Sequence, residues 1–93
     1  MTTNIRRTSK CKKDVKRQKK RGMDFKEFKK IVNKIATGTP LPSTHRDHHL
    51  LGNYKKYKGA RECHVEPDWL LIYLRSKNEL ILIRTGTHAY LFG

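Results

Sequence analysis

The sequence predicts an α+β fold in which two N-terminal antiparallel helices pack on one face of a small, mainly antiparallel, twisted sheet. Two helix-forming segments lie within residues 10–37 and are separated by only a few residues. Strand-like segments then follow one another between residues 61 and 84, which is typical of a meander. Because 93 residues bury one modest core, we expect residues 1–93 to form a single domain.

Residues 10–21 are predicted to form the first helix. Thr8 or Ser9 is a suitable N-cap, and Gly22 is a suitable stop. The only apolar side chains of this segment, Cys11 and Val15, are spaced i,i+4. So narrow an apolar stripe predicts a helix that docks lightly and exposes a wide basic face. A merely solvated, charged helix is the alternative interpretation.

The second helix has clearer signals at both ends. Asp24 is a predicted N-cap, with Glu27 three residues later as in a capping box, and Gly38 is the predicted end. The apolar side chains recur at helical spacing and form one stripe, which consists of Phe25, Phe28, Ile31, Val32 and Ile35. This stripe should face the sheet.

The sheet is expected to contain four segments, which are residues 4–7, 61–65, 69–75 and 79–84. The third segment is almost continuously apolar, so it is the predicted central strand, and residues 76–78 form a tight turn to its partner. Residues 41–53 are interpreted as a connection because they contain prolines and a glycine. Residues 85–87 should break the last strand and carry His88 on a glycine-hinged turn.

The charge is large and unevenly distributed. The formal net charge is +14, and residues 1–34 contain 14 of the 22 Lys and Arg residues against three acidic residues. Such an excess indicates a polyanionic partner, which can be RNA, DNA, an anionic membrane or an acidic protein. A membrane is the weakest of these, because the first helix lacks a large apolar face.

The cysteines and the N-terminus bear on cellular location. Cys11 and Cys63 are far apart and follow no apolar leader segment, which predicts free thiols in a reducing cytoplasm. Residues 1–20 contain no apolar run, so neither a signal peptide nor a membrane-spanning segment is expected.

Three histidines can converge on the predicted sheet. Strand alternation places His64 on the face opposite Cys63, while His48 precedes the sheet and His88 follows it. Asp68, at the turn into the central strand, can orient an imidazole. Because imidazoles exchange protons near neutral pH, this group on a basic protein predicts a metal-free ribonuclease. Taken singly, each residue is as compatible with a purely structural role.

A metal site is a weaker interpretation of the same region. It would use the cluster of His45, His48 and His49 together with Cys63, but no CxxC or HExxH spacing is present. We therefore expect no metal and no cofactor.

Arginines and aromatic side chains are the candidate RNA-binding residues. Arg61 and Arg84 are the best candidates for phosphate contacts, because a guanidinium matches the geometry of a phosphate. Trp69 can stack on a base or pack in the core, and its ring favours the core. Phe92 can likewise stack on a base or close the core.

Most of these candidates fall in three blocks of sequence, which are DHHLLG at 47–52, RECHVEPDWLLIY at 61–73 and RTGTHAYLF at 84–92. In this order the blocks closely resemble the YafQ branch of the RelE-superfamily toxins. The resemblance runs from about Asp47 to the C-terminus and is looser in the helices. One departure is residues 52–61, which are longer than expected in this branch. Lys55 and Lys56 in this longer segment can add an RNA contact.

The resemblance implies a RelE-like fold and a cytoplasmic bacterial toxin of a type II toxin–antitoxin system. Such toxins are ribosome-dependent mRNA interferases, which cut the message in the decoding site of the 70S ribosome. A DinJ-like antitoxin would neutralise the toxin in a heterotetramer with two toxins, and the complex would bind operator DNA. The family's catalytic and aromatic positions map onto His48, His64, Asp68, His88, Trp69 and Phe92.

The expected chemistry is attack by the RNA's own 2′-OH, which gives a 2′,3′-cyclic phosphate and a 5′-OH without a metal. We expect His88 as the general acid and His64 or Asp68 as the base, with His48 in support. Arg61 and Arg84 would stabilise the developing charge. The competing interpretation is a non-catalytic RNA- or DNA-binding module, which explains the charge without the histidines.

Overall fold

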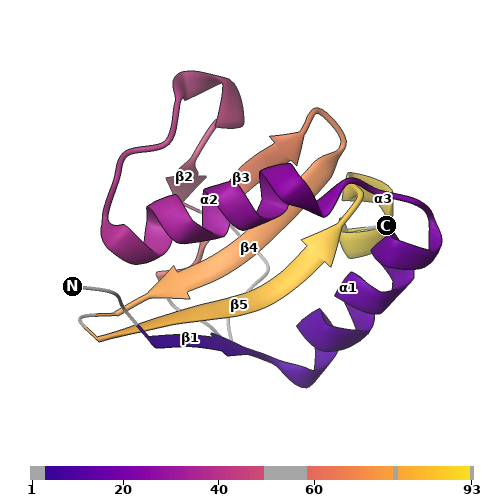
Figure 1. The fold of residues 1–93 in the computed structure, drawn as a ribbon, viewed down its shortest axis with the longest axis horizontal. Coiled ribbons are helices and arrows are strands. Elements are labelled where there is room, and N and C mark those ends of the chain that lie inside the picture. Colours follow the sequence, from indigo (N-terminus) through magenta and orange to yellow (C-terminus); the bar gives the residue numbers. More distant parts are fainter. Residues whose placement is uncertain (1–3, 50–58, 77, 93) are drawn as a thin grey trace.

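The computed structural model describes residues 4–49, 59–76 and 78–92 (Figure 1). The elements in chain order are β1 (Asn4–Arg7), α1 (Ser9–Lys20), α2 (Phe25–Thr37), the 3₁₀ helix η1 (Ser43–His45), β2 (His48–His49), β3 (Arg61–Glu66), β4 (Trp69–Arg75), β5 (Glu79–Gly86) and α3 (His88–Phe92). Within these residues the sheet has the order β1-β5-β4-β3-β2. Among the described strands only β1 pairs in parallel, with β5, so the predicted mainly antiparallel α+β fold is confirmed.

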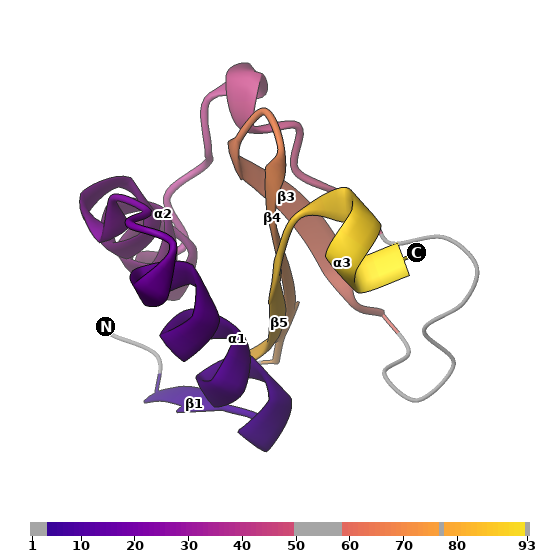
Figure 2. The same cartoon turned by 90° about the vertical axis from the view of Figure 1, so that its right-hand side faces the viewer.

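The two long helices cover one face of the twisted sheet, and α3 lies on the other (Figure 2). The main core lies between the helices and the sheet, and its largest members are Phe28, Ile31, Ile35, Trp69, Leu71, Tyr73, Leu80 and Leu82. A smaller cluster on the opposite face joins Ile72 and Ile83 to Leu91 of α3. Residues of both long helices belong to the main core, whereas the antiparallel packing of the helices on each other stays a prediction.

Helix α2 has the ends and the buried stripe that its sequence predicts. Asp24 accepts a hydrogen bond from the backbone N–H of Lys26 at 2.9 Å, and Gly38 ends the helix in the left-handed region at φ 76°. Phe25 and Phe28 pack against Trp69, with ring centroids 5.0 and 5.6 Å away. The apolar stripe therefore holds the helix on the sheet over the start of β4.

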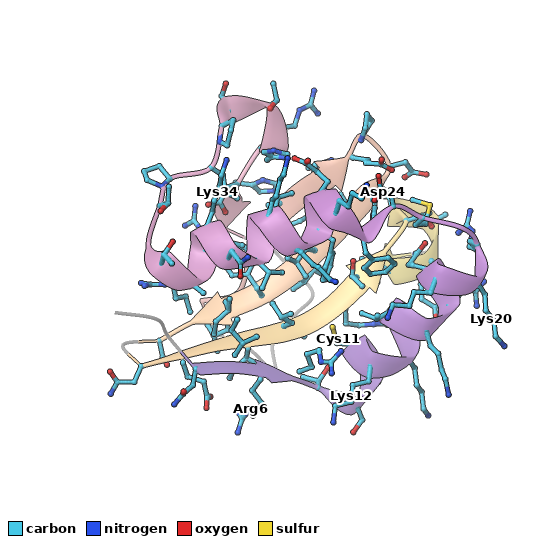
Figure 3. The ribbon with its side chains drawn as sticks, in the orientation of Figure 1. Arg6, Cys11, Lys12, Lys20, Asp24 and Lys34 are labelled. Atoms are coloured by element: carbon cyan, nitrogen blue, oxygen red, sulfur yellow. The ribbon has the colours of Figure 1, made fainter. Side chains whose placement is uncertain are left out.

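Helix α1 docks more firmly than expected. Its buried stripe contains Asp14 and Gln18 as well as the two apolar residues Cys11 and Val15. The prediction of light docking was wrong because the buried Asp14 has its hydrogen-bond partners, Arg84 and Thr85, on β5. The rest of the surface is basic, with cations such as Lys12 and Lys20 projecting away from the sheet (Figure 3).

Helix α1 also completes the edge of β5. Strand β1 pairs only with residues 79–82 of β5. Beyond that point the hydroxyl of Thr8 donates to the Ile83 carbonyl at 2.6 Å, and the backbone N–H of Thr85 donates to Asp14 at 3.2 Å. An edge strand needs such partners for its backbone groups. The helix therefore substitutes for a neighbouring strand.

Two predicted boundaries need correction. Residues 41–53 were expected to be a plain connection, but they contain η1 and β2, and β2 pairs with β3. Strand β5 continues through Thr85 and Gly86, because Thr85 pairs with Leu71 of β4 and is fully buried. His88 therefore begins the short helix α3 rather than lying on a turn. No helix in the described part of the chain is long and apolar enough to cross a membrane.

Candidate active site

Strand β3 brings two of the candidate histidines together around one carboxylate. Alternation along β3 directs Glu62 and His64 to one face, while Cys63 and Val65 enter the main core on the other, as predicted. In the pairing with β2, His48 lies opposite Glu62. Oε1 of Glu62 is 3.5 Å from Nε2 of His48 and 4.0 Å from Nε2 of His64. Glu62 is buried, and its carboxylate lies between the two imidazoles.

Backbone carbonyls orient both imidazoles. Nδ1 of His64 donates to the carbonyl of Pro67 at 3.2 Å, and Nδ1 of His48 donates to the carbonyl of Arg46. With Nδ1 engaged, Nε2 is the nitrogen that takes up or releases a proton in each ring. The carboxylate of Glu62 lies beside both Nε2 atoms. The sequence placed Glu62 on this face but gave no signal that it joins two histidines.

A third histidine supports the site from behind. Nδ1 of His45, in η1, donates to the backbone carbonyl of His64 at 2.7 Å, and its Nε2 is 3.6 Å from the carboxylate of Glu27 on α2. His45 therefore links η1 to α2 and β3. A hollow of about 320 Å³ opens beside His45, lined by residues 44–46 and 64–67.

His88 meets the same end of the sheet through Asp68. In the sheet register His64 pairs with Leu70, which in turn pairs with Gly86, two residues before His88. Asp68 lies in the β3–β4 turn next to Pro67, which contacts His64, and its Oδ1 accepts a hydrogen bond from the backbone N–H of His88 at 3.3 Å. His88 is exposed at the start of α3. Of the four predicted catalytic residues, His48 and His64 are therefore joined through Glu62, and Asp68 contacts His88 directly.

Arg84 reaches the edge of the site in a buried ion pair. Its Nε and Nη2 donate to the two carboxylate oxygens of Asp14, each at 3.0 Å, and its guanidinium lies 5.3 Å from the ring of Tyr90. Asp14 is 1% exposed, and the Arg84 side chain is 18% exposed. A phosphate contact by Arg84 stays a prediction. The sequence gave no sign of its partner, because 70 residues separate the two positions.

Arg61 is not part of the histidine group. Alternation along β3 turns it to the helix face, where its Nε donates to Asp47 at 3.1 Å. The hydroxyl of Tyr73 donates to the same carboxylate oxygen at 2.6 Å, and burial, followed by this hydrogen bond, raises the pKa of Tyr73. A phosphate contact by Arg61 stays a prediction, but it cannot occur beside His64 in this arrangement.

Trp69 requires a correction. Its ring is fully buried, and its Nε1 donates to the hydroxyl of Thr85 at 2.8 Å, so the predicted contact with an RNA base has no exposed surface to use. The core interpretation of Trp69 is confirmed. Cys63 is also fully buried on the face opposite His64, so it cannot join the histidines as a metal ligand.

Four other predictions are not decided by these contacts. Lys55 and Lys56 lie outside the described residues, and the side chains of His49 and Phe92 are not described, although their backbones belong to β2 and α3.

Both cysteines are buried free thiols, as expected. Among the described residues, no group of three His, Cys, Asp or Glu side chains is arranged to hold a metal ion.

Comparison with known proteins gives the family. The sequence profile described as "Bacterial toxin of type II toxin-antitoxin system, YafQ" matches residues 3–93. The mRNA interferase toxin YafQ of Escherichia coli K12 is 46% identical over 82 residues, which are 87% of this chain and 86% of that protein. A chain of the E. coli DinJ–YafQ toxin–antitoxin complex superposes with a TM-score of 0.89 at 40% identity, covering 100% of both chains.

A metal-bound toxin from Helicobacter pylori is similar to the same degree, with a TM-score of 0.89 at 42% identity over 99% of this chain and 100% of that one. The matches agree in sequence and in fold, and they span the helices as well as the histidine-bearing sheet. The chain therefore belongs to the YafQ family of bacterial toxins of type II toxin–antitoxin systems.

Proposed function

We propose that this toxin is a ribosome-dependent mRNA interferase that cuts translated messages by metal-free acid–base catalysis. The observation that carries the proposal is that Glu62 lies beside the imidazoles of His48 and His64, while Asp68, next to the Pro67 that contacts His64, accepts the backbone N–H of His88. The net charge of +14 suits a substrate held within ribosomal RNA. The E. coli relative is itself named an mRNA interferase toxin.

The proposed reaction is an in-line displacement at phosphorus. A base removes the proton of the 2′-OH, the 2′-oxygen forms a bond to the adjacent phosphorus, and the bond to the 5′-oxygen breaks. An acid returns a proton to the departing 5′-oxygen. The products are a 2′,3′-cyclic phosphate and a 5′-OH, so no water and no redox partner are consumed.

The contacts favour one assignment of roles. The carboxylate of Asp68 already accepts the backbone N–H of His88, which suits a residue that positions α3. Nε2 of His64 lies beside Glu62, and the carboxylate would stabilise the ring after it takes the 2′-OH proton. We therefore assign His64 as the base, His88 as the general acid, and His48 as the ring that shares Glu62 with the base. The hollow beside His64 offers room for a nucleotide.

The proposal includes the partners of the toxin. It would act in the bacterial cytoplasm, on mRNA in the 70S ribosome, where the basic helices contact ribosomal RNA. A DinJ-like antitoxin would neutralise it in a heterotetramer with two toxins, and the complex would bind operator DNA. The support for this part is the likeness to a chain of the E. coli DinJ–YafQ complex.

The test is primer extension on a message translated in a cell-free system, with the same message left untranslated as control. Wild-type toxin should cut only the translated message. His88→Ala should lower the cleavage rate by about 10²–10⁴-fold, the usual contribution of a general acid. Binding of the variant to a short RNA should be unchanged.

Two results would contradict the proposal. Equal cleavage by His88→Ala would remove the assigned acid. An absence of cuts by the wild type, together with salt-sensitive RNA binding, would favour a non-catalytic nucleic-acid-binding module. The strongly basic α1 is the observation that keeps this second candidate in view.

A further inference from the structure

One residue of α1 contacts the short helix that carries His88. The guanidinium of Arg17, on α1, lies over the ring of Tyr90 with its Cζ 4.2 Å from the ring centroid. Tyr90 belongs to α3, two residues after His88, and the guanidinium of Arg84 lies 5.3 Å from the same ring. Arg17, Tyr90 and Arg84 therefore form one cluster, contributed by three elements, and its ring belongs to the helix that carries the proposed acid.

The ring of Tyr90 is held in place by its surroundings. A Cβ atom added to Gly86 would lie 3.0 Å from Cδ2 of Tyr90, so the ring rests directly on the bare backbone of β5. The backbone N–H of Tyr90 donates to the hydroxyl of Thr87 at 3.1 Å, which fixes the first turn of α3. Stacking on this fixed ring already restricts the side chain of Arg17 in the free protein. Arg17 therefore loses less conformational entropy when it binds a ligand.

The two arginines of the cluster differ in their charge balance. Asp14 neutralises Arg84 in a bidentate pair. Among the ion pairs of the described residues none involves Arg17, which is exposed on the surface of α1. A guanidinium that lies on an aromatic ring keeps its N–H edge directed outward, in the plane that suits a phosphate. The cluster therefore presents to solvent one uncompensated positive charge, which is the guanidinium of Arg17.

The neighbouring cations extend this surface along the helix. Lys10 and Lys13 precede Arg17 at spacings of seven and four residues, so they follow the same side of α1 and are also exposed. Lys16 is turned by about 100° around the helix from Arg17, and it lines a groove with Lys12, Lys13 and Lys19. This difference provides a matched control within one turn of helix.

We propose that Arg17, stacked on Tyr90 beside Arg84, forms a phosphate-binding subsite for the RNA strand next to His88. The inference rests on the proposed function for the identity of the polyanion. RNA is favoured over an acidic protein segment because Tyr90 and His88 share the five-residue helix α3, which fixes the subsite to the reacting end of the sheet. The subsite would bind a phosphate adjacent to the one that is cut.

The experiment measures binding of a short single-stranded RNA whose 2′-oxygens are methylated, so that it cannot be cut. Its affinity is followed by fluorescence anisotropy over a range of salt concentrations. Losing one phosphate contact on a single strand should reduce the slope of log affinity against log salt by about 0.7. Across a fourfold range of salt this corresponds to about a threefold change in affinity.

Arg17→Gln should show this loss, whereas Lys16→Gln, which removes the same charge, should keep the wild-type slope. Arg17→Lys should recover only part of the affinity, because an ammonium neither stacks nor forms a fork. Tyr90→Leu should weaken binding in the same direction, and combining it with Arg17→Gln should add little further loss. Should Tyr90→Leu fail to fold, the comparison of Arg17→Gln with Lys16→Gln decides the matter, since both side chains are exposed.

The possible failures are distinguishable. If Arg17→Gln and Lys16→Gln have the same slope, the subsite does not exist, whatever the toxin cuts. If Arg17→Gln binds RNA normally but loses affinity for an acidic antitoxin segment, the surface is a protein-binding one and the proposal is overturned. If the wild type cuts no translated message while Arg17→Gln still weakens RNA binding selectively, the subsite stands and the proposed nuclease fails.

Discussion

Removing the carboxylate of Asp14 should destabilise this protein more than removing any exposed carboxylate. Asp14 is 1% exposed and accepts hydrogen bonds from Nε and Nη2 of Arg84, each at 3.0 Å. It also accepts the backbone N–H of Thr85 at 3.2 Å. In Asp14→Ala a guanidinium and a buried edge N–H lose their acceptor together. The three bonds join α1 to the strand that leads into the candidate active site.

The magnitude follows from the burial of the two partners. Breaking a buried ion pair by removing one partner costs about 3–5 kcal/mol, because a charge is left uncompensated. The Arg84 side chain is 18% exposed and can recover some hydration, which places the expected loss near the lower limit, at about 3 kcal/mol. The unpaired N–H of Thr85 keeps it from falling much below that value, since a buried donor without a partner costs about 1–3 kcal/mol.

The assay is urea unfolding followed by the fluorescence of Trp69, which is the single tryptophan and is fully buried. Asp24→Ala is the matched control, because it removes an exposed N-cap carboxylate and should cost about 1 kcal/mol. Replacing both partners, as Asp14→Leu with Arg84→Met, should recover the part of the loss that comes from the uncompensated charge, while the N–H of Thr85 stays unpaired. An Asp14→Ala protein less than about 1 kcal/mol below wild type would refute the reasoning.

Two further predictions concern His45 and the two buried thiols. His45→Ala should lower the free energy of unfolding by about 1 kcal/mol, because it removes the hydrogen bond to the His64 carbonyl. The contact with the half-exposed Glu27 should add little. The same urea titration measures the loss, and unchanged stability would show that these contacts of His45 are dispensable. Burial raises the pKa of Cys11 to about 11 and that of Cys63 to about 12, so both thiols should resist alkylation in the native protein. Because unfolding exposes these thiols with a pKa near 9.0, their contribution to stability is complete below that pH and is lost as the pH rises through about 11 for Cys11 and about 12 for Cys63. Unfolding titrations at pH values below and within this window, with no decrease at the higher pH, would contradict this.

The sequence by itself determined the features that depend on neighbouring residues. The N-cap Asp24, the terminating Gly38 and the apolar stripe between them were predictable because caps and helical spacing are local. The alternation in β3 separated Cys63 from His64 for the same reason. The four histidine and aspartate candidates could be named in advance from their residue types and from the resemblance, although their roles stay predictions.

Only the tertiary structure decided which side chains meet. Asp14 looks like one acid within a basic helix until β5, 70 residues away, supplies Arg84 as its partner. Glu62 joins two histidines only because β2 pairs with β3, and the two-residue strand β2 is too short to leave a pattern. Trp69 was left open between core and RNA, and α2 decided it by covering the ring. In each case the partner is distant along the chain, and local sequence patterns contain no information about contacts of that kind.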